Sequence, residues 1–136
     1  MVSMKKRLAI FCVTYNSYFE LKVYLSSLDT AASKVSSLLN VDIFIVDNTE
    51  EGVQKVDYLD TFSHINCILF PFHENNGYFG GVKKGMEGVD VKIYDFVAKI
   101  IFATISALSP QSNIMAFAKC KSTRFKKFLS SSVSSF

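Results

Sequence analysis

The sequence predicts an α/β protein with a doubly wound, mostly parallel sheet. Apolar runs of strand length alternate with amphipathic helical stretches along residues 7–97, which is the pattern of repeated strand-helix-strand units. Polar or glycine-rich residues follow each run, as expected where a buried parallel strand ends. With 136 residues and 49% apolar composition, the chain is large enough for one hydrophobic core and therefore for one domain.

The first predicted strand covers residues 7–14 (RLAIFCVT) and leads directly into a helix. Ser17 and Glu20 have the spacing of a capping box, so the helix is expected to begin there. Its apolar face repeats every three or four residues and consists of Leu21, Leu25, Leu28, Ala32, Val35 and Leu39. This pattern fits either one long helix or two helices with a break near residues 29–30.

The other three strands are expected near residues 42–47, 66–71 and 93–98, parallel to the first, which should be central. A weaker helical stretch, from Val53 to Phe62, separates the second strand from the third. In doubly wound sheets, ligands bind beyond the carboxyl ends of the strands. The residues that follow each strand are therefore the first place to look for a site.

Residues 74–86 (ENNGYFGGVKKGM) form a glycine-rich segment directly after the third strand. The segment is not a Walker loop, because Met86 stands where that loop needs Lys-Ser or Lys-Thr, and its spacing also differs from G-x-G-x-x-G. It is expected to open a helix whose inner face consists of Phe79, Val82, Met86 and Val89. Its bare backbone suits either close approach to a ligand or a tight strand-to-helix turn.

The cysteine pattern and the lengths of the apolar runs exclude several classes of protein. The three cysteines are far apart and form no CxxC pair, which argues against a zinc site and predicts a reduced, cytoplasmic protein. No apolar run is long enough to span a membrane. The net charge is +3, and all twelve acidic residues lie at or before Asp95.

Residues 99–136 therefore form a basic, Ser-rich tail without a single acid. We expect this tail to be atypical, either disordered or the product of a frameshift. Its charge is compatible with contact to anionic lipid at the inner face of the membrane, and no nucleic-acid partner is expected.

Three short motifs, taken together, resemble family-2 glycosyltransferases. The first strand ends in Thr-Tyr-Asn-Ser, the second in Val-Asp-Asn, and the third is followed by Asn-x-Gly and a Gly-Gly pair. The order and spacing over residues 7–97 are most similar to the rhamnosyltransferase-like enzymes of bacterial polysaccharide synthesis. The resemblance implies a GT-A fold, of which residues 1–98 would be a partial, incomplete nucleotide-sugar-binding domain. It also implies a uridine- or thymidine-type nucleotide-diphosphate sugar as ligand, with Mg or Mn in full-length members.

The resemblance implies a nucleotide-sugar site built from Thr14, Tyr15, Asn16, Asp47, Asn48, Gly77, Gly80 and Gly81. The first three would line the pocket, and the glycines would let the backbone pass close to the nucleotide. Asp47 would accept a hydrogen bond from the pyrimidine base, and Asn48 would shape the turn. Without a ligand, Asp47 could instead cap that turn, and Asn16 could be a simple turn residue.

The chain departs from the family in two places. Lys83 stands where the family usually has Asn, and no acidic metal motif follows residues 94–97 (YDFV). The catalytic base of the family is missing as well, so the sequence assigns no catalytic or metal-binding residue. We expect a glycosyltransferase fragment for cell-surface polysaccharide synthesis; the alternative is a catalytically inactive nucleotide-binding module or a small α/β interaction domain.

Overall fold

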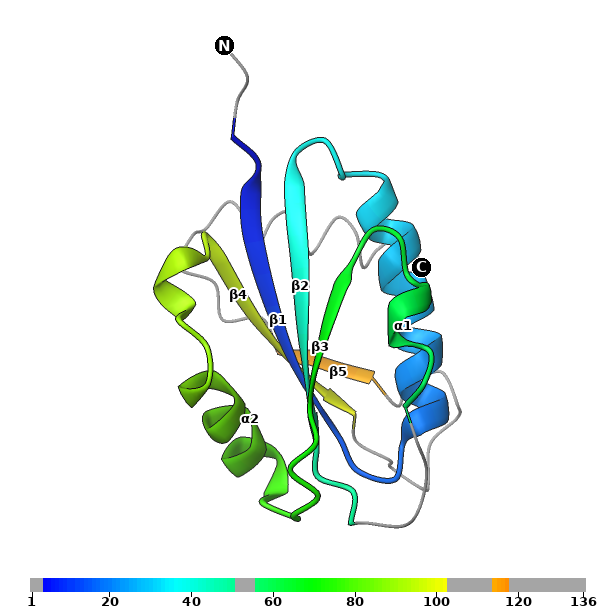
Figure 1. Cartoon of the computed structure of the whole chain (residues 1–136), viewed down its shortest axis with the longest axis vertical. Coiled ribbons are helices and arrows are strands. Elements are labelled where there is room, and N and C mark those ends of the chain that lie inside the picture. The colour runs from blue at the N-terminus through cyan, green and yellow to red at the C-terminus, as the bar shows by residue number, and fades with distance from the viewer. Residues whose placement is uncertain (1–3, 51–55, 103–113, 118–136) are drawn as a thin grey trace.

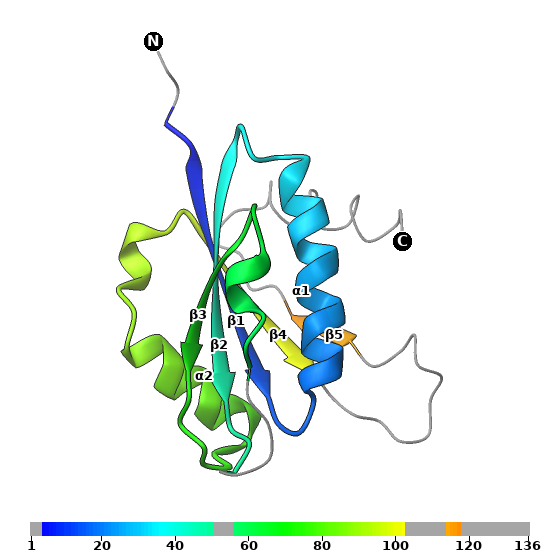
Figure 2. The ribbon, with the colours of Figure 1, turned by 45° about the vertical axis from the view of Figure 1, so that its right-hand side comes forward.

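The computed structural model describes residues 4–50, 56–102 and 114–117. They form a five-stranded sheet in the order β3-β2-β1-β4-β5, with α1 and α2 on opposite faces (Figure 1, Figure 2). The first four strands are parallel, and the fifth runs antiparallel to the fourth. The doubly wound, mostly parallel sheet with its first strand central is thereby confirmed. The strands are β1 (Lys6–Thr14), β2 (Leu39–Asp47), β3 (Asn66–Phe70), β4 (Phe96–Phe102) and β5 (Ile114–Phe117).

The helix after β1 is a single element, α1 (Tyr18–Ser33), without a break near residues 29–30. Ser17 stands at its N-cap position, but the expected capping box does not form. The Ser17 hydroxyl instead donates to the carbonyl oxygen of Tyr15 at 2.9 Å. The Ser17 side chain thus bonds to the loop after β1, while the Ser17 carbonyl oxygen accepts from the Leu21 backbone N–H at 2.9 Å in the first turn of α1.

Short 3-10 turns change two expected features. A helix was expected from Val53 to Phe62, but the structure has only a short 3-10 turn there, over Leu59–Thr61. Residues 53–55 of this stretch lie outside the described part of the chain. A second turn, Val91–Ile93, delays the start of β4 to Phe96. The Asp90 side chain accepts a hydrogen bond from the Lys92 backbone N–H at 3.2 Å and so fixes this turn.

Part of the expected tail belongs to the sheet. β4 runs to Phe102, beyond the expected strand end at residue 98, and Phe102 pairs with Ile114 of β5. The strand can continue because β1 supports it on one side and β5 on the other. The rest of the tail, residues 103–113 and 118–136, lies outside the described part of the chain.

The two faces of the sheet carry separate apolar cores. On the α1 face, Leu21 and Leu25 pack against a cluster that includes Cys12 and Ile45. On the other face lies α2 (Gly77–Glu87), which buries Val82 against Val13 and Val46. An aromatic stack, with Phe11 and Phe44 centroids 4.9 Å apart, continues that second core toward the starts of the strands.

Glycines bring α2 close to the sheet and thereby set its inner face. A Cβ on Gly85 would lie 2.6 Å from Val46 Cγ2, a distance that packed atoms do not reach. With Gly81 and Gly85 turned inward, Phe79 lies two residues, about 200°, away from Gly81 around the helix. Phe79 is accordingly 81% exposed, so its predicted place on the inner face is wrong. Val82, in contrast, is buried as expected.

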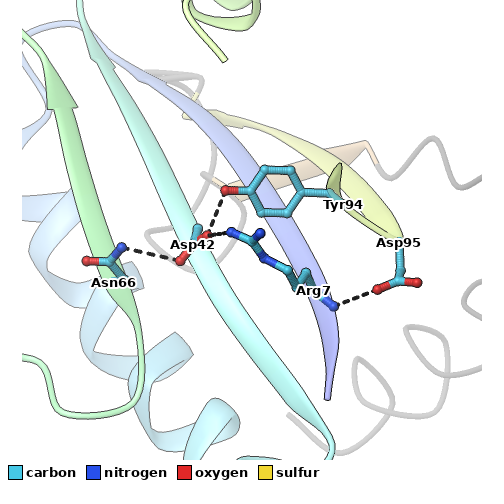
Figure 3. Close-up of polar contacts among 5 residues, drawn as sticks. All are labelled: Arg7, Asp42, Asn66, Tyr94 and Asp95. Atoms are coloured by element: carbon cyan, nitrogen blue, oxygen red, sulfur yellow. Dashed lines mark hydrogen bonds and ion pairs between the residues drawn. The ribbon is translucent and has the colours of Figure 1, made fainter. Parts of the chain in front are cut away.

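A polar network closes the sheet at the amino ends of its strands (Figure 3). The Tyr94 hydroxyl donates to Asp42 Oδ2 at 2.6 Å, and the Arg7 guanidinium donates to the same oxygen at 3.4 Å. The Asn66 amide donates to Asp42 Oδ1 at 3.3 Å, and the Arg7 guanidinium lies 4.7 Å from the centre of the Tyr94 ring. Asp95 accepts from the Arg7 backbone N–H at 2.9 Å, which lowers the pKa of the Asp95 carboxyl. These contacts join β1, β2, β3 and the segment before β4.

Neither helix among the described residues has the combination of length and apolar character needed to cross a bilayer.

We expect Gly85→Ala to destabilise the fold and Gly80→Ala to leave it intact. The added methyl group at residue 85 would press into Val46, and overpacking of this kind costs roughly 1–3 kcal/mol. At residue 80 the nearest atom would be Asn76 Cβ at 3.4 Å, so the alanine fits and gains helix propensity of up to about 1 kcal/mol. Urea unfolding of both variants measures the difference; equal stabilities would contradict the close packing of α2.

The stability of the fold should fall in alkaline solution through Tyr94. Burial, followed by the hydrogen bond to Asp42, raises the pKa of Tyr94 to about 12 from its ordinary value of 10.0. The folded protein thus favours the neutral phenol, and this contribution is complete below pH 10 and lost as the pH rises toward 12. Tyr94→Phe should lower stability at neutral pH but lose less stability than the wild type between pH 10 and 12. Identical pH dependence of the unfolding free energy in the two proteins would refute this role.

Candidate functional site

The carboxyl ends of β1, β2 and β3 bring the expected motifs to one edge of the sheet, at the lower end of Figure 1. Thr14 is the register partner of Asp47, and the Asn48 backbone N–H donates to the Thr14 carbonyl oxygen at 2.9 Å. The Asn48 side chain reaches the other way and donates from Nδ2 to the carbonyl oxygen of Gly77 at 3.0 Å. The glycine segment therefore lies beside the end of β2, as the sequence predicts.

Side-chain alternation divides these residues between the two faces of the sheet. Thr14 and Asp47 are neighbours in register and continue the row of Cys12 and Ile45, which faces α1. Asn48 points to the other face, where it meets the first turns of α2. A ligand at this edge would therefore meet side chains from both layers.

Internal hydrogen bonds occupy the Asp47 carboxylate. Its Oδ1 accepts from the Thr49 backbone N–H at 2.9 Å, and its Oδ2 accepts from the Tyr18 hydroxyl at 2.7 Å. Asp47 is only 2% exposed. The turn-capping role that the sequence left open for Asp47 is thus present in the structure. Burial raises the pKa of Tyr18, the Thr49 side chain lowers it, and the Asp47 carboxylate raises it, so the phenol remains a neutral donor.

Thr49 joins three loops, and sequence reasoning did not single it out. Its hydroxyl accepts from the Asn16 backbone N–H at 2.9 Å, and its carbonyl oxygen lies 2.8 Å from His73 Nδ1. Together with the bond to Asp47, these contacts link the segments after β1, β2 and β3. Tyr18 was missed as well, although a hydroxyl-bearing aromatic in the first turn of α1 was a visible signal.

The backbone at this edge adopts left-handed conformations. Among the described residues, φ is positive at Asn16 (51°), His73 (53°) and Gly77 (66°), and all of them lie in the loops at the carboxyl edge or at the start of α2. Such conformations are uncommon for residues with a side chain and concentrate at functional sites. Gly77 adopts this conformation without the steric cost that a side chain would bring.

The glycines after Gly77 have different surroundings. Gly81 is buried, and a Cβ there would lie 2.9 Å from Asn48 Nδ2 and 3.3 Å from the Val13 methyl groups. Its bare backbone is thus explained by packing of α2 against the sheet. Gly80 is exposed and, with Gly77, offers open backbone at the first turns of the helix. Gly77 and Gly80 are thus the two expected site glycines at which a ligand could approach the backbone closely.

At this edge, two buried polar atoms have no hydrogen-bond partner in the part of the chain that the structure describes. They are Thr14 Oγ1 and Asn48 Oδ1, and both residues are at most 1% exposed. A buried polar group without a partner is costly, and native proteins seldom keep one without a reason. Tyr15 and Asn16 lie exposed beside this position.

The described residues do not assemble a metal site, because no group of three His, Cys, Asp or Glu side chains comes together among them. Near the edge, Asp47 is used by Tyr18 and Thr49, and Glu74 pairs with Lys84 at 3.2 Å. The divalent metal implied by the resemblance therefore has no fitting ligands here, and we assign no step to it.

Two surface hollows are lined by residues other than Thr14, Asp47 and Asn48. One of about 550 Å³ is at the amino ends of the strands and includes Arg7, Asp42, His64 and Asn66. Another of about 380 Å³ lies beside α2 and β4, and its lining residues are Phe79, Val82, Lys83, Met86, Glu87 and Lys99. The first hollow is on the edge opposite to the expected motifs.

Comparisons of this chain with protein-family models, with curated proteins and with solved structures found no match.

Removing the Thr49 hydroxyl should loosen the carboxyl edge. Thr49→Val keeps the shape of the side chain but leaves the Asn16 backbone N–H without its acceptor, which costs about 1–3 kcal/mol of unfolding free energy. Thr61→Val is the matched control, because the Thr61 hydroxyl is exposed and water can replace its bond to the Tyr58 carbonyl oxygen. Equal losses in the two variants, measured by urea unfolding, would show that Thr49 does not hold the loops together.

Proposed function

We propose that this chain carries the nucleotide-binding half of a family-2 glycosyltransferase, with a uridine- or thymidine-diphosphate sugar as its ligand. One observation carries the proposal: Asn48 joins all three motifs, through its backbone N–H to Thr14 and through its side chain to Gly77. Motifs that are each weak in sequence thus share one edge of a sheet, at the end where doubly wound folds bind ligands.

The free groups at this edge suit a nucleotide. The Thr14 hydroxyl can donate or accept and the Asn48 amide oxygen accepts, so each could pair with a different polar group of a nucleotide that reaches both faces of the sheet. The start of α2 provides backbone N–H groups and the positive end of a helix dipole, which favour a diphosphate. Gly77 and Gly80 carry no side chain of their own over this backbone, and the Gly77 N–H donates to Asn75 Oδ1 at 3.2 Å, a bond that a phosphate oxygen would have to replace.

These residues would bind the nucleotide, and sugar transfer is the activity that the family resemblance implies for the full-length enzyme. In the family, an acceptor hydroxyl would displace the nucleotide directly at the anomeric carbon, with a carboxylate as base. No carboxylate follows Asp95 in this sequence, and no residue here is given the role of base. We therefore expect the 136-residue chain to bind nucleotide without transferring sugar.

A small α/β interaction domain is the second candidate. Phe19 and Phe79 are 77% and 81% exposed, and both lie in the first turn of a helix at the carboxyl edge. The two residues lie on opposite faces of the sheet, and aromatic side chains are enriched in protein–protein interfaces. An interaction domain would bind no nucleotide, so a nucleotide titration separates the two candidates.

Calorimetric titration with uridine and thymidine diphosphate tests the proposal. Asp47→Asn should weaken binding by about 1–3 kcal/mol, because the amide keeps the shape of the carboxylate but loses an acceptor for the base. Asp57→Asn is the control, since Asp57 is exposed and lies outside the site. Absence of saturable binding to the folded wild-type chain would reject the proposal, whereas unchanged affinity in Asp47→Asn would remove Asp47 alone from the site.

A further inference from the structure

The hollow of about 380 Å³ beside α2 and β4 has the size and the lining of a small-molecule site. Its apolar part comes from α2, where Phe79, Val82 and Met86 recur at helical spacing along one side of the helix. Val82 and Met86 also pack into the core beneath, whereas Phe79 is 81% exposed. Ligand pockets in proteins have volumes of roughly 300–1,000 Å³ and mostly apolar walls with a few polar groups, and this hollow fits that description.

Lys99 brings a positive charge into this apolar hollow from the β4 side. It is half-buried and pairs in register with Phe11 of β1, and Val97, two residues earlier on the same face of β4, packs into the aromatic core. The Lys99 ammonium has no ion pair or hydrogen bond among the described residues. An unpaired charge becomes more costly as it is withdrawn from water, so an acidic ligand group would be favourable at this position.

The other charges of the lining leave the hollow positive. Lys83 is the second cation, and Glu87, one helical turn further along α2, is the acid. Within the described part of the chain, Glu87 forms an ion pair with neither Lys83 nor Lys99. The adjacent Lys84, in contrast, is already paired with Glu74 at 3.2 Å. The hollow therefore presents two cations and one carboxylate, none of them neutralised by a neighbour.

The segments after β4 offer no acidic side chain for these cations, because no Asp or Glu follows Asp95 in the sequence. Residues 118–136 carry cations instead, which Lys83 and Lys99 would repel. These cations are Lys119, Lys121, Arg124, Lys126 and Lys127. The occupant that complements the charge of the hollow is therefore a separate molecule.

We propose that the hollow binds a small amphiphilic anion, a molecule with one acidic group on an apolar body. The acidic group pairs with Lys99 and Lys83, and the body covers Phe79 and Met86. The body excludes water from the ion pairs and thereby strengthens them, whereas Glu87 opposes binding by repulsion. The inference does not depend on the proposed function, because none of the lining residues belongs to the nucleotide site.

Fluorescence titration with anilinonaphthalene sulfonate tests this site, because this dye carries one sulfonate on an aromatic body. Lys99→Met keeps an apolar side chain of similar length but removes the charge, so it should weaken binding about three- to tenfold. Glu87→Gln removes the repulsion and should strengthen binding. Lys92→Met is the matched control, because Lys92 is exposed and lies outside the hollow, in the turn before β4. Its affinity for the dye should equal that of the wild type.

A second dye separates the charge from the apolar contact. N-Phenylnaphthylamine has the same aromatic body without the sulfonate, so the wild type and Lys99→Met should bind it equally. Unchanged affinity of Lys99→Met for anilinonaphthalene sulfonate, or equal losses in Lys99→Met and Lys92→Met, would overturn the site. Weaker binding of both dyes to Lys99→Met would overturn it as well, because the sulfonate would then have no special role.

Backbone amide NMR of the wild-type chain locates the dye without any substitution. Anilinonaphthalene sulfonate should shift the signals of residues 79–87 and 97–99 together, with one saturation curve. Signals of residues 63–66, at the amino edge of the sheet, should stay unchanged. Shifts confined to the loops of either edge, or no saturable binding to the folded chain, would overturn the site and leave the proposed nucleotide site standing.

Discussion

The buried polar turn at the end of β2 holds the carboxyl edge of the sheet together. Asp47, Asn48 and Thr49 are consecutive, all are at most 2% exposed, and each bonds to a different part of the fold. Asp47 holds the start of α1, Asn48 holds the end of β1 and the start of α2, and Thr49 holds the loops after β1 and β3. Burying three polar residues is unfavourable unless their groups are paired, so the loops must adopt the conformations that pair them.

The two ends of the sheet differ in how completely their polar groups are paired. At the amino ends, Asp42 receives hydrogen bonds from Tyr94, Arg7 and Asn66 and forms a closed network. The carboxyl ends combine left-handed backbone with the buried oxygens of Thr14 and Asn48, which have no hydrogen-bond partner among the described residues. Closed networks stabilise a fold, whereas unpaired buried atoms and unusual backbone are typical of places that bind something. This asymmetry supports a ligand site at the carboxyl edge, even though a hollow of about 550 Å³ lies at the other.

Much of the fold could be predicted from the sequence, because strand length, periodicity and the residues that follow each strand are local signals. They predicted four parallel strands with the first one central. They also predicted that the segments of Thr14, Asn48 and Gly77 lie at the same end of the sheet. What failed depends on contacts between distant segments: the inner face of α2 follows from close packing of its glycines, which turned Phe79 outward. The bond between Tyr18 and Asp47 joins residues 29 positions apart, so no local pattern reveals it. β5 (Ile114–Phe117) was not predicted either, because it lies within residues 99–136, which the composition assigned to an atypical tail.

Backbone amide NMR with uridine diphosphate tests the central claim most directly, since it reports every loop at once and requires no substitution. A nucleotide at the carboxyl edge should perturb the amide signals of residues 14–17, 47–49 and 76–81 together, with one saturation curve. Signals of Arg7 and His64, which line the hollow at the amino edge, should stay unchanged. Perturbation confined to the amino edge, or no perturbation of the folded chain, would contradict the account.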